Sequence, residues 1–271
     1  MVFRRLAFRY FFLLAALTPW PAPAADETMS PSTGAWQFLR PQFYGEREIG
    51  EVDEAFMSIE APASTPDPAA TPVSLRFGKD AVGSVRRVRV IIDNNPSPIA
   101  STIEIAAGVP VDEIDLRVRV DRFTSIRAIA ETGDGRLEMR STWIKASGGC
   151  SAPPAADGDG KTGDVRFRAS PDGKSLQVSI RHPNHSGFQI DPRSGDAIPP
   201  HYVSHISLRA GGKALIDVDS GISISENPTI RIVSDQPLAA PLTLDATDSK
   251  DAHFSATWNG ADAAHREPAA P

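Results

Sequence analysis

Short stretches in which apolar and polar residues alternate run along most of the chain. Residues 87–93 and 116–121 show the pattern clearly, because Val, Ile and Leu side chains there are separated by Arg or Asp. Alternation with a period of two predicts β-strands that bury one face. Ile91 breaks the pattern, because it is apolar where a polar residue is expected. Strands are predicted at residues 56–60, 73–77, 87–93, 99–105, 116–121, 125–131, 137–145, 165–168, 176–180, 201–209, 214–218, 229–233, 241–246 and 253–258.

The strands fall into two sets of seven, separated by a segment rich in Gly, Pro and Asp. Seven short strands divided by turns are typical of an immunoglobulin-like sandwich. The predicted fold class is therefore all-β, with two immunoglobulin-like β-sandwiches joined by a flexible Gly/Pro/Asp linker. The predicted organisation is a signal peptide at 1–24, an N-terminal arm at 25–50, sandwiches at 51–147 and 164–258, the linker at 148–163 and a disordered tail at 259–271. In the arm, Trp36, Phe38 and Phe43 are candidates to pack a short helix onto the first sandwich.

The first 24 residues have the pattern of an export signal. A basic segment that ends at Arg9 precedes an apolar run of about eight residues and the small-residue motif Ala22-Pro23-Ala24. We therefore expect the mature chain to begin at Ala25 and to be exported to a periplasm or an extracellular space. The sequence leaves the choice between the general and the twin-arginine export routes open. No later apolar run reaches the roughly 20 residues that a membrane span needs.

Composition narrows the class of partner. Beyond residue 24 the chain has 25 basic and 34 acidic residues, which gives a formal charge of −9. An acidic protein repels phosphate backbones, so nucleic acids are not expected partners. Glycine and proline together account for 44 of the 271 residues, which favours many turns and short elements over long helices.

Cys150 is the single cysteine of the chain. It cannot form an intramolecular disulfide, and an unpaired cysteine in an exported protein indicates a free thiol or an intermolecular partner. The residues around it, from Ser147 to Pro154, include no large apolar side chain. From the local sequence we expect a mobile, solvated segment with an accessible thiol. The alternative is a buried and inert cysteine, because Cys packs like a small apolar residue.

Three groups of residues carry a resemblance to a known family. They are the Asn-Pro turn and strand Asn94–Ala100, the segment Ile144–Cys150 that ends in Gly-Gly-Cys, and a set in the second half. That set comprises Ile180–Pro183, Gly187, Ile198–His201, Asn227–Pro228 and Trp258. In this order, over about residues 50–258, the chain resembles SoxY followed by SoxZ. It is similar to the fused SoxYZ-like carriers associated with quinoprotein dehydrogenases.

The resemblance implies a carrier rather than an enzyme, with no cofactor. It identifies Cys150 as the residue that holds a sulfur or other small intermediate covalently, and Gly148 and Gly149 as the source of arm flexibility. The implied partners are periplasmic oxidation enzymes, either Sox-type or a quinoprotein dehydrogenase. In the family the arm ends the chain as Gly-Gly-Cys-Gly-Gly, whereas here Cys150 is internal and Ser151 follows it.

Two other interpretations remain. Histidines suggest a metal site, but His201 and His205 lie four residues apart on a predicted strand, which places their side chains about 13 Å apart. His182 and His185 are a second close pair, and no metal site is predicted from either. The alternative function is a non-covalent docking module for a periplasmic dehydrogenase, in which Cys150 is incidental.

Overall fold

The computed structural model describes residues 33–154 and 161–260. The predicted signal peptide, the first residues of the arm, residues 155–160 of the predicted linker and the tail from residue 261 lie outside the described residues. Within these two ranges, no helix is long and apolar enough to cross a membrane.

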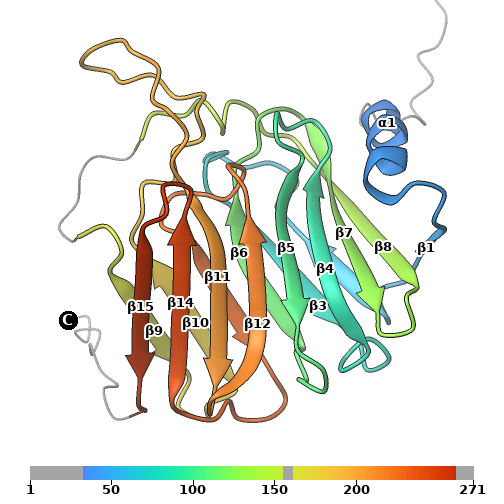
Figure 1. Cartoon of the computed structure of the whole chain (residues 1–271). Coiled ribbons are helices and arrows are strands. Elements are labelled where there is room, and N and C mark those ends of the chain that lie inside the picture. Colours follow the sequence, from blue (N-terminus) through green and yellow to red (C-terminus); the bar gives the residue numbers. More distant parts are fainter. Residues whose placement is uncertain (1–32, 155–160, 261–271) are drawn as a thin grey trace, which may run out of the picture. The chain divides into compact units, whose positions relative to one another are not determined.

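The described residues form one helix and two β-sheets (Figure 1). The elements are α1 (Thr33–Tyr44), β1 (Ile49–Glu51), β2 (Met57–Glu60), β3 (Thr71–Phe77), β4 (Val85–Ile92), β5 (Ile99–Ile105), β6 (Glu113–Val118), β7 (Thr124–Thr132), β8 (Leu137–Ile144), β9 (Val165–Ala169), β10 (Ser175–Ile180), β11 (Val203–Ala210), β12 (Lys213–Ser220), β13 (Thr229–Val233), β14 (Leu242–Asp248) and β15 (His253–Trp258). The all-β prediction is confirmed, and all fourteen predicted strands are present with ends that differ by a few residues. The three-residue β1, which pairs parallel to β8, was not predicted.

Both sheets run through both halves of the chain. The larger has the order β1-β8-β7-β4-β5-β12-β11-β14-β15, and the smaller has the order β2-β3-β6-β13-β10-β9. The halves meet where β5 pairs antiparallel with β12 and where β6 pairs antiparallel with β13. The two sandwiches are thus joined edge to edge by main-chain hydrogen bonds, in addition to the covalent connection.

The apolar core is continuous across this junction. Ile103 and Ile114 from the first half belong to the same buried cluster as Val218 and Ile232 from the second. At the surface of the junction, Arg231 on β13 forms ion pairs of 2.6 and 2.7 Å with Glu113 and Asp115 on β6. The core and the pairing together favour a single folding unit for the described halves.

The helix α1 explains the break in alternation on β4. Ile91 is fully buried in a second cluster with Trp36, Leu39 and Tyr44 of α1. The end of β4 is therefore covered on both faces, which requires apolar residues at consecutive positions. Phe38 does not take part in this packing, because its side chain is 70% exposed.

Candidate functional site

The Gly-Gly-Cys segment follows β8 and lies against the junction of the two halves. The Cys150 side chain is only 1% exposed. The expectation of an accessible thiol is therefore wrong for this conformation. We call residues 147–152, which lead from β8 through Cys150, the thiol arm.

The first half of the chain holds the thiol arm by its backbone. Gly148 N–H donates to Asp121 O, and Gly149 N–H donates to Val120 O, each at 2.9 Å. A Cβ at position 149 would lie 2.1 Å from Pro68 O, so only glycine permits this approach. Gly148 has a φ of +81°, which glycine adopts readily. In this conformation Gly149 permits the close packing and Gly148 permits the positive φ, and their predicted role in arm flexibility stays a prediction.

The second half covers the thiol arm with polar side chains. The Ser186 hydroxyl donates to Cys150 O, and Gln189 Nε2 donates to Ala152 O at 2.8 Å. Ser186 and Gln189 are themselves almost fully buried. Within the arm, Ser147 and Ser151 are exposed, whereas Gly149 and Cys150 are buried. Main-chain atoms of the arm are held by hydrogen bonds from both halves.

Arg119 is a buried cation beneath the arm. Its guanidinium donates to Gly149 O and to Asn184 O, both at 3.1 Å, and its side chain is 2% exposed. The Nε atom has no hydrogen-bond partner. Burial lowers the pKa of Arg119, and the nearby Cys150 and Glu226 oppose this effect. Arg119 therefore links the thiol arm to residue 184 of the second half.

The Asn-Pro turn noted in the sequence supports the same region. Asn95 is buried, and its Nδ2 donates to Arg119 O at 2.7 Å and to Ser223 Oγ at 3.0 Å. Its Oδ1 accepts from Asp121 N–H at 2.9 Å. Asn95 thus fixes residues 119–121, which contact the thiol arm directly.

The surroundings of Cys150 keep its thiol protonated. Burial raises the pKa of Cys150 from its ordinary value of 9.0 to about 12, and Asp121 adds to the rise while Arg119 opposes it. At pH 7 the docked thiol is therefore un-ionised. Because the thiolate is the nucleophile, the docked thiol is unreactive.

Two family descriptions match the chain over consecutive stretches. "Sulfur oxidation protein SoxY" matches residues 40–150, and "Sulphur oxidation protein SoxZ" matches residues 165–259. The chain belongs to the SoxYZ family. The SoxY match ends on Cys150, and the resemblance to SoxY followed by SoxZ is confirmed. SoxY and SoxZ domains place the chain in a family of sulfur-oxidation carriers.

Solved structures show weaker likenesses. The sulfur carrier protein SoxY from Chlorobium limicola f thiosulfatophilum is 20% identical, covers 42% of this chain and 93% of its own, and has a TM-score of 0.35. A superoxide reductase (neelaredoxin) from Ignicoccus hospitalis is 14% identical, covers 36% of this chain and 94% of its own, and has a TM-score of 0.32. A putative superoxide reductase from Thermotoga maritima is 18% identical, with the same coverage and TM-score. No curated protein matches the chain.

Exposed apolar side chains lie close in sequence to residues that hold the thiol arm. Four large apolar residues are exposed among the described residues, and Phe38 on α1 is one of them. Phe123 is 54% exposed and lies two residues after Asp121, which binds Gly148. Phe188 and Ile190, 48% and 53% exposed, flank Gln189. We call Phe123, Phe188 and Ile190 the apolar rim. Three of the four exposed large apolar residues are thus near neighbours in sequence of Asp121 or Gln189, which bind the thiol arm.

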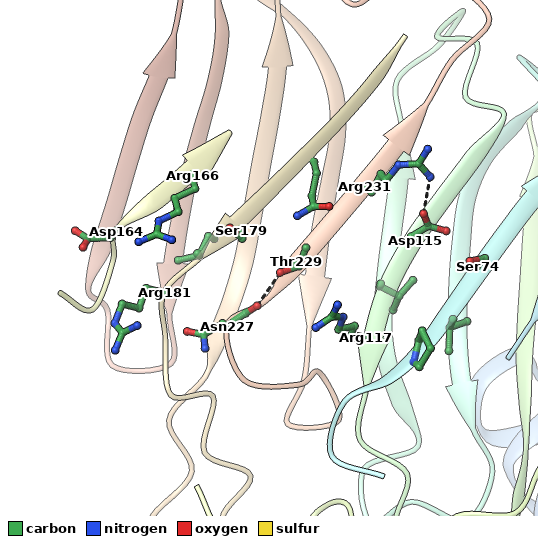
Figure 2. Close-up of a pocket in the computed structure, with 15 residues that line it drawn as sticks. Ser74, Asp115, Arg117, Asp164, Arg166, Ser179, Arg181, Asn227, Thr229 and Arg231 are labelled. Carbon is green, nitrogen blue, oxygen red and sulfur yellow. Dashed lines mark hydrogen bonds and ion pairs between the residues drawn. The ribbon is translucent and has the colours of Figure 1, made fainter. Parts of the chain in front are cut away.

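A polar groove crosses the junction on the outer face of the smaller sheet (Figure 2). Its volume is about 510 Å³, and its charged lining residues are Arg117, Arg166, Arg181, Arg231, Asp115 and Asp164. Arg231 is paired with Asp115. Arg117 and Arg166 are exposed, and neither forms an ion pair with any residue that the structure describes. The groove therefore has an excess of positive charge on an acidic protein, which suits an anionic group or an acidic surface.

The histidines are arranged differently from the sequence interpretation. His201 does not lie on β11, and His205 pairs with Asp219 at 2.8 Å instead of with His201. His182 and His201 instead approach each other, with ring centroids 4.5 Å apart, and both contact Asp248. Nothing in the sequence pointed to Asp248, which lies 47 residues after His201.

Proposed function

We propose that this protein is a periplasmic covalent thiol carrier. It holds a sulfur or other small intermediate on Cys150 and presents it to partner oxidation enzymes, of the Sox type or in a quinoprotein dehydrogenase system. The observation that carries the proposal is the end of the SoxY match on the chain's only cysteine. The periplasmic location rests on the export pattern of the first 24 residues.

The docked state of the arm sets a requirement for loading. A thiol that is 1% exposed and protonated cannot attack a cargo, so the thiol arm must first move away from the residues that bury it. Release breaks the hydrogen bonds from Ser186 and Gln189 and exposes Cys150 to solvent. From Ala146, which is buried, the thiol is four residues away, so it can move out by at most about 13 Å.

For a sulfur cargo the loading step is an oxidative coupling. One bond forms between Cys150 Sγ and the cargo sulfur. The Cys150 thiol loses its proton, a cargo that carries an S–H group loses its proton too, and the two electrons pass to an electron-accepting redox protein of the same oxidation system. The carrier supplies the sulfur nucleophile and its position, and the partner supplies the oxidation.

The apolar rim supports presentation to a partner. Exposed aromatic residues are characteristic of protein interfaces. A partner that covers Phe123 and Phe188 would contact the two chain segments that hold the thiol arm. Docking of a partner oxidation enzyme on the rim therefore gives a direct way to release the arm where the cargo is handled.

A second candidate is a non-covalent docking module for a periplasmic dehydrogenase. The burial of Cys150 favours it, because an inert cysteine has no part in docking. The groove favours it too, because Arg117 and Arg166 come from different halves and carry unpaired charge. In this case an acidic partner surface would bind across the junction.

One pair of experiments separates the two candidates. Mass spectrometry of the protein isolated from its native cells should show an adduct on Cys150 if it is a carrier. Complementation of a deletion strain should fail with Cys150→Ser and succeed with the double variant Arg117→Ser and Arg166→Ser. Full complementation by Cys150→Ser, with loss in the arginine variant, would refute the carrier and support the docking module.

A further inference from the structure

Three possible metal ligands converge at one end of the SoxZ half. His182 Nε2 and His201 Nε2 lie 3.4 and 2.7 Å from the same atom, Asp248 Oδ2. His182 follows β10, His201 precedes β11 and Asp248 ends β14. All three ligand atoms lie within 4.8 Å of one another. Three separate chain segments thus bring two imidazoles and a carboxylate to one point.

Asn184 contacts Nδ1 of His182 in two ways, one of which leaves Nε2 free to bind a metal ion. Asn184 Oδ1 accepts from Val203 N–H at 3.0 Å, which fixes the orientation of the amide. The same oxygen lies 2.9 Å from His182 Nδ1, so a proton on Nδ1 makes this contact favourable. Asn184 N–H also donates to Nδ1, at 3.1 Å, and this hydrogen bond belongs to the other tautomer, with the proton on Nε2. With the proton on Nδ1, the lone pair of Nε2 faces the carboxylate oxygen of Asp248, and the two repel each other. A cation between them would remove this repulsion.

The two carboxylate oxygens of Asp248 have different surroundings, and Oδ2 is the one that could bind a cation. Its Oδ1 accepts from the N–H groups of Lys250 and Ala252, at 2.8 and 3.0 Å. Its Oδ2 contacts only the two imidazoles among the hydrogen bonds of the described residues. Metal-binding histidines and carboxylates in proteins are held by outer hydrogen bonds of this kind. The site therefore has its ligands and most of their supporting contacts in place.

Access and spacing also suit a metal ion. His182 and Asp248 are buried, but the side chain of His201 is 20% exposed, which opens a path from solvent. Ligands of a tetrahedral zinc ion lie about 3.3 Å apart, given zinc–nitrogen and zinc–oxygen bonds of about 2.0–2.1 Å. The His182–Asp248 separation already matches this value. The His201–Asp248 contact must open by about 0.6 Å, and the metal ion would take the place of the hydrogen bond between them.

We propose that His182 Nε2, His201 Nε2 and Asp248 Oδ2 bind one divalent transition-metal ion, with Zn²⁺ as the best match. Two imidazoles and one carboxylate form the ligand set of three-residue zinc sites, which leave a fourth position for water or another ligand. The site does not involve Cys150 and stands independently of the carrier proposal. A bound ion would crosslink three chain segments, which follow β10, precede β11 and end β14.

The test is a Zn²⁺ titration of the full chain after chelation, followed by calorimetry. One equivalent should bind, and His201→Gln and Asp248→Asn should each weaken binding at least a hundredfold. His205→Gln is the matched control, because His205 pairs with Asp219 outside the cluster. Cys150→Ser is a second control, since the thiol is not a ligand. Both controls should bind as tightly as the unchanged chain.

A second readout keeps the test decisive if a cluster variant fails to fold. Co²⁺ bound to the unchanged chain should give the visible absorption of a four-coordinate site, without the near-ultraviolet band of a cobalt–thiolate bond. Absence of stoichiometric Zn²⁺ binding would overturn the proposal. Binding that persists in both cluster variants, or is lost in either control, would overturn it as well.

Discussion

Removal of the Ser186 hydroxyl should make Cys150 react faster with thiol reagents. In the structure this hydroxyl donates to Cys150 O and covers the thiol arm from the SoxZ half. The buried thiol reacts only after the arm opens, so the reaction rate is the fraction of open arm multiplied by the rate for a free thiol. Any substitution that weakens the docked state therefore raises the rate in proportion.

The size of the effect follows from the hydrogen bond that is lost. One such bond contributes about 1 kcal/mol, and a carbonyl left unpaired in a buried site costs about 1–3 kcal/mol. Ser186→Ala should therefore raise the open fraction, and with it the rate, about 5- to 150-fold. The upper limit is the rate of the unfolded chain, at which the arm offers no protection.

The assay is alkylation with iodoacetamide at pH 7.5, followed by intact-mass spectrometry. Cys150 is the only cysteine, so each adduct reports this one site. Ser204→Ala is the matched control, because it removes a hydroxyl–carbonyl hydrogen bond to Thr247 on β11 and β14, away from the arm's contacts. A wild-type rate equal to that of the chain in denaturant would refute the docked arm. An equal rate in Ser186→Ala and Ser204→Ala would refute the role of Ser186.

Three further predictions concern the same region. Gly149→Ala should lower the free energy of unfolding in urea by more than about 1 kcal/mol and speed alkylation of Cys150, because the new Cβ would lie 2.1 Å from Pro68 O. Because the pKa of Cys150 is raised on folding, the neutral docked thiol contributes its full stabilisation below about pH 9, and this contribution is lost as the pH rises toward 12. The free energy of unfolding, measured from pH 8 to 11, should therefore fall more steeply in the wild type than in Cys150→Ser. Phe188→Ser should reduce complementation of a deletion strain while changing stability by no more than about 0.5 kcal/mol, and Phe38→Ser, which removes an exposed aromatic side chain from α1, should not reduce it.

The strands could be predicted because each depends mainly on its own residues. Alternation along β4 and β6 follows from burial of one face, and it remains visible in any sequence window. The break at Ile91 was also visible, but its cause was not, because α1 covers it from a segment about 50 residues earlier. Pairing of β5 with β12 joins positions more than 100 residues apart, and no local pattern specifies that register.

The burial of Cys150 could not be predicted from its neighbours. Their small and polar side chains indicate a solvated loop when the segment is considered alone. The cover comes from Arg119, Ser186 and Gln189, which bind main-chain oxygens of the arm and not its side chains. Main-chain acceptors are present at every residue, so a sequence carries no mark of which of them will be used. The role of Asp248 could not be predicted either, because its contact with His201 joins the end of β14 to the segment before β11, 47 residues apart in sequence.

The docked position of the thiol arm depends on the pairing of the two halves. Arg119 belongs to the SoxY half and donates to Gly149 O on the arm, and it also donates to Asn184 O of the SoxZ half. Ser186 lies two residues beyond Asn184, so a shift of the SoxZ half along β6 and β13 would move Asn184 O away from Arg119 and the Ser186 hydroxyl away from Cys150 O. Protection of the thiol is therefore coupled to the register of the sheets. Under the proposed carrier function, a partner that strains this junction would release the arm without touching the thiol, and this is the physical reason to expect carrier activity to respond to docking.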